Sequence, residues 1–264
     1  MKGGARVAAW LLLLGCEAEA TRCEGDDLFG IPNEYTGLDS KTCRPTCENC
    51  GSEGWSPPAY GAREFADWRS RILLNSPATP ASDPYLNPPP ATPASSDAVC
   101  AVETDPDGYR LADYPSPDAA REAGASPTHF GSCGLCSPLA DLAVYAENPE
   151  LTEPVRACGL SFFAGPPEDH VACLLALGFT EPCAWIWYYN TVHTREACGA
   201  VCLAALDDPW NLPDGSLNEC LACDEEESAD VFAAVAGRTR RNTGLASSIC
   251  RPCGEVRPLD HSYP

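Results

Sequence analysis

The sequence predicts a mainly α-helical, disulfide-rich protein with a proline-rich linker and a small N-terminal unit stapled by cysteines. Three observations support this fold class. Residues 98–254 contain repeated helix start and stop signals, and stretches with the alternation of a strand are short and weak. The chain also has 17 cysteines in 264 residues. So many cysteines indicate a disulfide framework around a modest core.

The first twenty residues (1–20) have the pattern of a signal peptide. Lys2 and Arg6 precede the apolar run VAAWLLLLG, and AEA at 18–20 is a small-residue cleavage pattern. Removal of this segment takes away Cys16 and leaves sixteen of the 17 cysteines, which can form up to eight disulfides in a secreted, extracellular chain. Alternatively, LLGC resembles a bacterial lipobox, and Cys16 would then carry a lipid anchor.

The remaining cysteines fall into two groups, separated by 49 residues without a cysteine. The first four lie in a predicted small Cys-rich unit at 21–75, and the other twelve lie between Cys100 and Cys253. Because both numbers are even, we expect each group to close on itself and to form a separately stapled unit. Residues 76–97 form a Pro/Ala/Ser/Thr-rich linker with a repeated PATPAS, which is typical of a semi-rigid spacer that holds the two units apart.

Residues 98–254 are predicted to form a disulfide-stabilised helical domain, followed by a tail at 255–264. A short amphipathic helix is also expected at FADWRSRILL in the N-terminal unit. The helices expected in the larger domain are SPDAAREAG, LADLAVYAENP, PPEDHVACLLALG, CAWIWYYNTVHTREACGAVCLAAL and SADVFAAVAGRTRR. The fourth is apolar almost all round its axis, which is typical of a helix at the centre of a domain.

The chain is strongly acidic, with a formal net charge of −21. Such a chain repels phosphate backbones and anionic membrane surfaces, so we expect no nucleic-acid partner. No apolar run approaches the roughly 20 residues that a membrane-spanning helix needs. We therefore expect no membrane span, and an unknown extracellular protein or glycan as the partner.

The segment HFGSCGLCSPLADLAVY (129–145) carries the main candidate for chemistry. GSCGLCS resembles the papain and cathepsin signature, in which Cys136 would be the nucleophile at the start of a helix. Phe130 stands where that family has its oxyanion-hole glutamine, and only 128 residues follow Cys136 (264 − 136), so the papain fold does not fit. A C-x-x-C at a helix start is also typical of a dithiol redox site, with Cys133 as the reactive thiolate and His129 as its proton partner.

A third interpretation makes the CGLC cysteines the ends of ordinary disulfides. Three other C-x-x-C pairs occur, at 47/50, 220/223 and 250/253, and no βαβ pattern frames CGLC. The last two pairs also have near-zinc-site spacing, which an oxidising compartment disfavours. We assign no metal and no cofactor. His193 lies in YYNTVHTRE, close in sequence to Asn190 and Arg195. If the protein is an enzyme, the catalytic candidates are Cys133, Cys136, His129 and His193.

The segment CDEEESADVFAAVAGRTRR separates its charges, with acidic residues at the start of a predicted helix and arginines at its end. That order complements the helix macrodipole and requires no further function. Two functional alternatives stay open. The acidic run at 224–227 is a candidate calcium site, and RTRR, ending at Arg241, matches the pattern cut by secretory convertases, so cleavage at Arg238–Arg241 is an alternative.

The segments THFGSCGLCS, NECLACDEEES and AGRTRRNTGLASSICRPC are similar to cysteine-rich secretory-pathway proteins predicted in unicellular eukaryotes such as algae. The resemblance covers residues 98–254 and implies export in a eukaryote, with no catalytic residue to carry over. The sequence thus favours a secreted, disulfide-stabilised binding or structural protein. The alternative is a cysteine-dependent enzyme, a thiol-disulfide oxidoreductase or a hydrolase, that uses CGLC.

Overall fold

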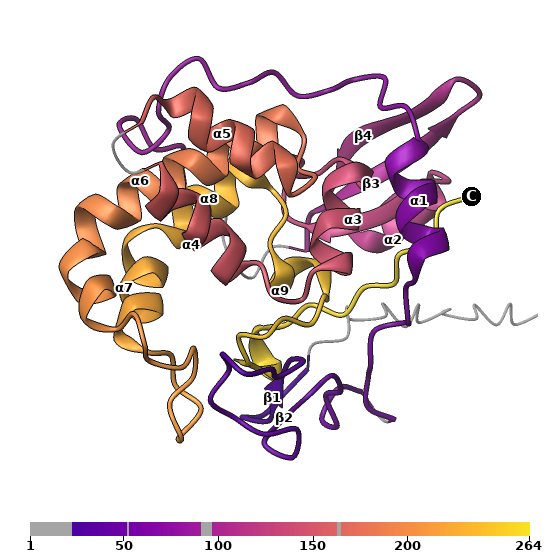
Figure 1. Ribbon diagram of the computed structural model, residues 1–264. Helices are drawn as coiled ribbons and strands as arrows, with labels where there is room; N and C mark the ends of the chain where they lie inside the picture. Colours follow the sequence, from indigo (N-terminus) through magenta and orange to yellow (C-terminus); the bar gives the residue numbers. More distant parts are fainter. Residues whose placement is uncertain (1–22, 52, 91–96, 163–164) are drawn as a thin grey trace, which may run out of the picture.

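Figure 1 shows the computed structural model, which describes residues 23–51, 53–90, 97–162 and 165–264. The predicted signal peptide at 1–20 lies outside the described residues, as do Cys16 with its alternative lipid and most of the second PATPAS repeat. In Figure 1 the larger sheet lies with α1, α2 and α3 on one side of the molecule, α4 to α8 lie on the other, and a small sheet lies below.

The prediction of a mainly α fold is wrong, because the fold is mixed: 39% helical and 14% strand, with two small sheets. The larger sheet is antiparallel with the strand order β4-β3-β5. Its strands are β3 (Val99–Asp105), β4 (Gly108–Tyr114) and β5 (Ser126–Phe130).

Strand β3 is buried on both faces of the sheet, which explains why the sequence pattern does not predict it. Cys100 and Val102 belong to the main hydrophobic core, whereas Val99 and Ala101 belong to a second, smaller core on the opposite face. Side chains of a strand alternate between the two faces, so a strand that is buried on both reads as a short apolar run without alternation. The run VCAV therefore gave no period-two signal.

Helices follow most of the start and stop signals in the sequence. α2 begins after Ser116, whose Oγ accepts a 3.1 Å hydrogen bond from the Ala119 amide, and this confirms the predicted N-cap. The helices of the described residues are α1 (Ala62–Ser70), α2 (Pro117–Glu122), α3 (Leu139–Glu147), α4 (Thr152–Ser161), α5 (Pro167–Ala176), α6 (Glu181–Ala204), α7 (Glu219–Glu227), α8 (Ala229–Ala236) and α9 (Arg240–Thr243).

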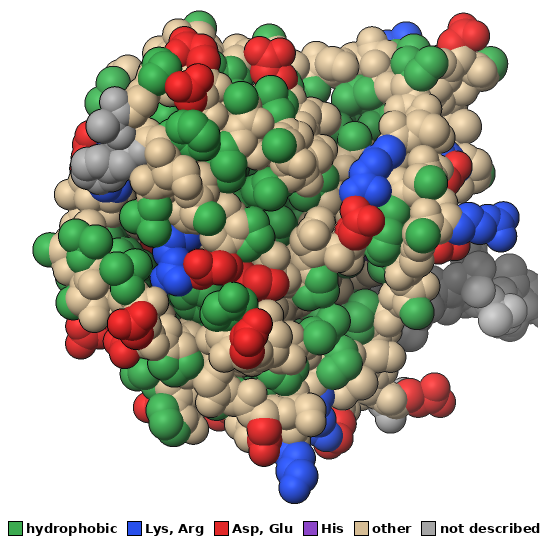
Figure 2. Space-filling view, in the orientation of Figure 1, with side chains coloured by type: hydrophobic (Ala, Val, Ile, Leu, Met, Phe, Trp, Pro, Cys, Tyr) green, Lys and Arg blue, Asp and Glu red, His purple; other side chains and the backbone are tan. Residues whose placement is uncertain are grey.

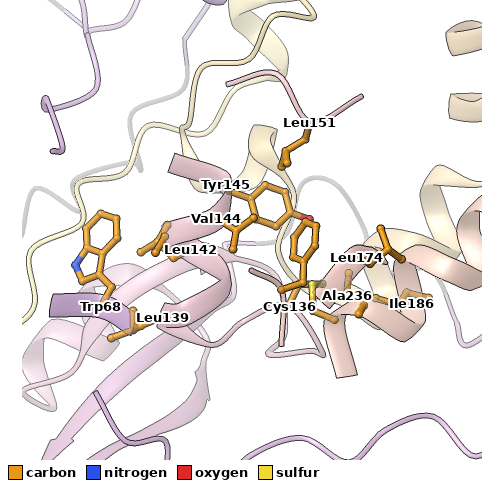
Figure 3. Packing of buried hydrophobic residues seen from close by; sticks show 14 of the residues in the cluster. Trp68, Cys136, Leu139, Leu142, Val144, Tyr145, Leu151, Leu174, Ile186 and Ala236 are labelled. Atoms are coloured by element: carbon orange, nitrogen blue, oxygen red, sulfur yellow. A yellow bond between two sulfur atoms is a disulfide. The ribbon is translucent and has the colours of Figure 1, made fainter. Parts of the chain in front are cut away.

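The main core lies between the sheet and the helical layer. Figure 3 shows Leu142 and Tyr145 of α3 extending toward their neighbours in this core, with Trp68 of α1 on one side and Ile186 of α6 on the other. The long helix α6 is less central than its apolar sequence suggested. Only four of its residues are fully buried: Cys183, Ala184, Ile186 and Cys198.

Disulfides join the two ends of the chain. Cys23 pairs with Cys50, but Cys43 pairs with Cys250 and Cys47 with Cys253. The expectation that each cysteine group closes on itself is therefore wrong. The same ends build the small sheet, with the order β2-β1-β6, from β1 (Leu28–Phe29), β2 (Cys43–Arg44) and β6 (Arg251–Pro252), and the 3-10 helix η1 (Cys253–Glu255) follows. The residue boundaries predicted for the domains stay predictions.

The described part of the linker lies on the helical layer instead of spacing two units apart. The Tyr85 ring stacks on the His193 imidazole of α6, with ring centroids 4.4 Å apart. The Tyr85 hydroxyl donates a 2.6 Å hydrogen bond to Asn190 Oδ1. None of the helices in the described part of the chain combines the length and hydropathy needed to cross a bilayer.

Candidate functional site

The two CGLC cysteines are bonded to different partners. Cys133 pairs with Cys100 of β3, and Cys136 pairs with Cys183 of α6. A dithiol redox site needs its two cysteines to exchange a disulfide with each other, and a cysteine protease needs a free thiolate. In this oxidised fold the motif holds neither, and it ties the sheet and α6 to one loop.

His129 forms a hydrogen bond with a serine instead of a cysteine. Its Nδ1 donates to the Phe130 carbonyl oxygen at 3.0 Å, so its Nε2 accepts from Ser137 Oγ at 2.6 Å. A Ser–His hydrogen bond is a feature of many hydrolases. Here both side chains are fully buried, and burial, aided by Arg238, lowers the pKa of His129 well below its ordinary value. The pair therefore fixes the loop and has no access to a substrate.

The first arginine of the RTRR segment, Arg238, has a structural role in the interior of the protein. Arg238 is 0% exposed, and its guanidinium donates to four oxygens: the carbonyls of Cys136, Thr128 and Ser137, and Thr128 Oγ1. Helix α8 ends at Ala236, so the acidic residues and the arginines do not share one helix as predicted. The fold gives a protease no access to Arg238.

The four cysteines whose spacing is close to that of a zinc site all form disulfides. Cys220 and Cys223 of α7 pair with Cys202 and Cys198 of α6, while Cys250 and Cys253 pair with the N-terminal cysteines. Two residues of the acidic run have side-chain partners as well. Asp224 accepts from Thr194 Oγ1, and Glu225 contacts Arg241 and Arg251 at 2.7 and 2.6 Å. Burial raises the pKa of Glu225, but these two arginines outweigh it and hold the pKa below its ordinary value.

His193 lies away from the CGLC segment. Besides stacking on Tyr85, its Nε2 lies 3.2 Å from the carbonyl oxygen of Glu227 in α7. The structure thus brings Cys133, Cys136 and His129 into one loop region, where both cysteines are in disulfides. It places His193 against the linker and α7.

A cleft between the helices of this layer has no signal in the sequence. Its volume is about 380 Å³, and α4, α6, α7, α8 and the segment 239–256 contribute its walls. On the face drawn in Figure 2, apolar side chains and a few charged ones lie over α4, α6 and α7. The apolar walls include Leu151, Val155, Trp187, Leu221, Phe232 and Leu245. A cleft of this size and character is typical of a small-molecule site.

Three buried polar atoms belong to residues that line this cleft. Tyr145 Oη and Trp187 Nε1 lie within hydrogen-bonding reach of each other, and both atoms, like Arg156 Nε, are almost wholly shielded from solvent. Tyr145 is only 2% exposed, and Figure 3 shows its ring extending from α3 on the side of Leu151, another residue of the cleft. Buried polar groups are nearly always satisfied in folded proteins. The Tyr145 hydroxyl and the Trp187 indole follow this rule by their contact with each other.

Tyr145 and Trp187 form the aromatic floor of the cleft, with ring centroids 6.3 Å apart. Burial raises the pKa of the Tyr145 hydroxyl well above its ordinary value, against the opposing effects of Arg240 and the Trp187 indole. The hydroxyl is therefore a neutral donor at physiological pH. Sequence reasoning missed this floor because Tyr145 and Trp187 lie in different helices, α3 and α6, within apolar runs that read as core.

Residues 167–258 match a family of unknown function (DUF8771). The matched segment begins at α5 and ends just beyond η1, so it contributes α6, α7 and α8 to the cleft and leaves out α3 and α4. The chain has no match among curated proteins and none among solved structures.

Proposed function

We propose that this chain is a secreted, disulfide-stabilised binding protein that holds a small ligand with an apolar body in the cleft between α4, α6, α7 and α8. One observation carries the proposal: a mainly apolar cleft of about 380 Å³ lies between these four helices. A ligand that covers the apolar walls would remove their surface from water, which contributes about 25 cal/mol for each Å² of apolar area.

The disulfides support a binding role because they fix the walls of the cleft. Cys202 and Cys220, which both line it, join α6 to α7, and the bridge from Cys198 to Cys223 joins the same helices one turn away. A preformed site loses less entropy on binding than a flexible one. Eight disulfides among the described residues also favour an oxidising, extracellular compartment.

Titration of the oxidised mature protein with a neutral solvatochromic dye such as Nile red tests this function. We expect saturable binding with one dye per chain and a blue-shifted emission. Gly199 of α6 lines the cleft, and a Cβ at this position would have only Arg195 Cγ within 4 Å, at 4.0 Å. A Gly199→Leu side chain would therefore start from open space at the wall of the cleft, and we expect it to weaken dye binding at least ~10-fold, about 1.4 kcal/mol.

Ala200→Leu is the matched control, because it adds the same side chain to an exposed position of the same helix that does not line the cleft. This variant should bind the dye as the unmodified protein does. Absence of saturable binding, or equal binding by the two leucine variants, would rule out the cleft as the site.

A further inference from the structure

We propose that the ligand of the cleft is an uncharged lipid with an alkyl body and a neutral head, such as a long-chain alcohol. This inference rests on the proposed function and specifies the class of ligand. It is carried by the balance of charge in and beside the cleft, and by the apolar residues at its mouth.

Three charged residues of the cleft, Glu225, Arg241 and Arg251, form ion pairs with one another. The Glu225 carboxylate contacts Arg241 Nη2 at 2.7 Å and Arg251 Nη2 at 2.6 Å. Arg241 Nη1 also contacts Glu255 Oε2 at 3.2 Å. A ligand anion would have to compete with these carboxylates for the guanidinium groups, and a ligand cation would have to compete with the guanidinium groups for Glu225.

Carboxylates also lie beside two further arginines of the cleft. Arg156 Nη2 pairs with Glu153 Oε2. Arg240 Nη1 donates a 2.9 Å hydrogen bond to the Tyr145 carbonyl oxygen. Burial lowers the pKa of Arg240 to about 10, against the opposing effects of Tyr145 and of the nearby Glu150. Both guanidinium groups are therefore charged at neutral pH, and each has a counter-charge close to it.

The remaining charged residues of the cleft are Asp224 and Arg195. The Asp224 carboxylate accepts hydrogen bonds from the side chains of Thr194, Ser228 and Asn190. Three donors occupy most of the roughly four lone-pair sites of a carboxylate, so an ammonium head would gain little there. Arg195 has a partner within the protein as well.

The formal charges in and beside the cleft are balanced. The five arginines that line it are matched by five carboxylates: Asp224 and Glu225, which line it, and Glu150, Glu153 and Glu255, which lie beside those arginines. The chain as a whole has a formal net charge of −21, so this balance is local. An ionic head that left water for the cleft would lose hydration without gaining a free counter-charge, which favours an uncharged head.

The mouth of the cleft suits an alkyl body. Leu160 of α4 is 54% exposed, and Leu203 and Leu206 are 63% and 37% exposed, yet all three line the cleft. Single exposed leucines are common, but three that line one cleft offer apolar surface that an alkyl chain would remove from water. A sugar would leave its hydroxyls against apolar walls, where they would lose hydrogen bonds to water.

Displacement of Nile red by three probes that share one tail tests the head group: decan-1-ol, decanoate and decyltrimethylammonium, each below its solubility limit or micelle concentration. We expect decan-1-ol to bind at least ~10-fold more tightly than either ion, about 1.4 kcal/mol. Equal or tighter binding of either ion would overturn the neutral head and leave the proposed binding function intact. Dye binding that none of the probes displaces would overturn the alkyl lipid, whereas failure of the dye itself would overturn the proposed function.

Glu153→Gln tests the balance of charge, because it removes the carboxylate that pairs with Arg156 and leaves the residues that line the cleft unchanged. We expect decanoate to bind this variant at least ~3-fold more tightly than the unmodified protein, a modest gain because the ion pair is partly exposed. Binding of decan-1-ol should not change. The matched control is Asp118→Asn, which removes the same charge from the ion pair with Arg121, outside the cleft. No gain for decanoate in Glu153→Gln, or an equal gain in both variants, would contradict the balance as the cause of the selectivity.

Leu203→Asn tests the placement of the alkyl body. Leu203 is 63% exposed, so its substitution should have little effect on stability. We expect decan-1-ol binding to weaken at least ~3-fold, because the chain would lose an apolar contact. Leu175→Asn is the control, since this leucine of α5 is also exposed, at 40%, and does not line the cleft. Equal decan-1-ol affinity for the two variants would place the alkyl chain elsewhere and overturn the inference.

Discussion

At the scale of single residues, CGLC and RTRR resemble functional motifs but act as parts of one internal connection. Arg238 donates to the carbonyl oxygens of Cys136 and Ser137, which close the CGLC loop, and to Thr128 of β5. The His129–Ser137 pair lies in the same loop. A guanidinium is suited to this place because its rigid, planar fork reaches several acceptors at once.

Arg238→Lys should be strongly destabilising although it conserves the charge. A lysine has a single ammonium group and cannot reach four oxygens, so buried carbonyls would lose their donors, at about 1–3 kcal/mol for each. We expect the free energy of unfolding, measured by urea denaturation monitored by fluorescence, to fall by at least ~2 kcal/mol. Arg121→Lys is the control, because Arg121 is exposed and paired only with Asp118; it should change stability by less than ~0.5 kcal/mol. Similar stability of both variants would contradict the structural role of Arg238.

At the scale of elements, the CGLC loop packs its backbone directly on the C-terminus of α8. The Cys136 amide donates to the Ala236 carbonyl at 2.8 Å, and the Leu135 amide donates to the Val235 carbonyl at 3.0 Å. A Cβ on Gly134 would lie 2.6 Å from the Ala236 carbonyl carbon and from the Gly237 amide nitrogen. The glycine between the two cysteines is therefore explained by the close approach of two backbones.

Gly134→Ala should separate the loop from α8. Since the clash involves backbone and cannot be relieved by a rotamer change, we expect a loss of at least ~2 kcal/mol of unfolding free energy. Gly199→Ala is the matched control in open space within α6. It should be neutral or stabilise the protein by up to ~1 kcal/mol, because alanine is the better helix former. Thermal denaturation followed by circular dichroism compares the two, and equal melting temperatures would contradict the packing.

Helix caps and apolar periodicity in the sequence predicted individual helices well, but they did not predict which distant segments contact each other. The Ser116 N-cap and the apolar periodicity of α3 and α5 are encoded within a few residues, so these helices could be predicted. Strand β3 could not, because its apolar run reflects burial on both faces. The candidate histidines illustrate the same limit: no local pattern indicates that His129 pairs with Ser137 or that His193 stacks on Tyr85. The cleft depends on contacts between distant segments and has no signal in the sequence.

At the scale of the whole molecule, disulfides covalently join the two cysteine groups that the sequence suggests are separate units. The bridges from Cys43 to Cys250 and from Cys47 to Cys253 span sequence separations of 207 and 206 residues. A bridge that closes such a long loop constrains the unfolded chain most, by about 5 kcal/mol for the first of the two in the chain-entropy treatment. They also hold the segments around Phe29 and Val256, which both help to line the cleft, close to each other.

Disulfide mapping of the native protein is the most direct test of the central claim that the CGLC cysteines are structural bridge ends. The protein is treated with an alkylating agent at neutral pH, digested without reduction and examined by mass spectrometry. We expect peptides that join Cys133 to Cys100 and Cys136 to Cys183, with no alkylated cysteine in the mature chain. A Cys133–Cys136 bridge, or stoichiometric alkylation of either residue, would contradict the account and make the thiol-enzyme hypothesis the leading one.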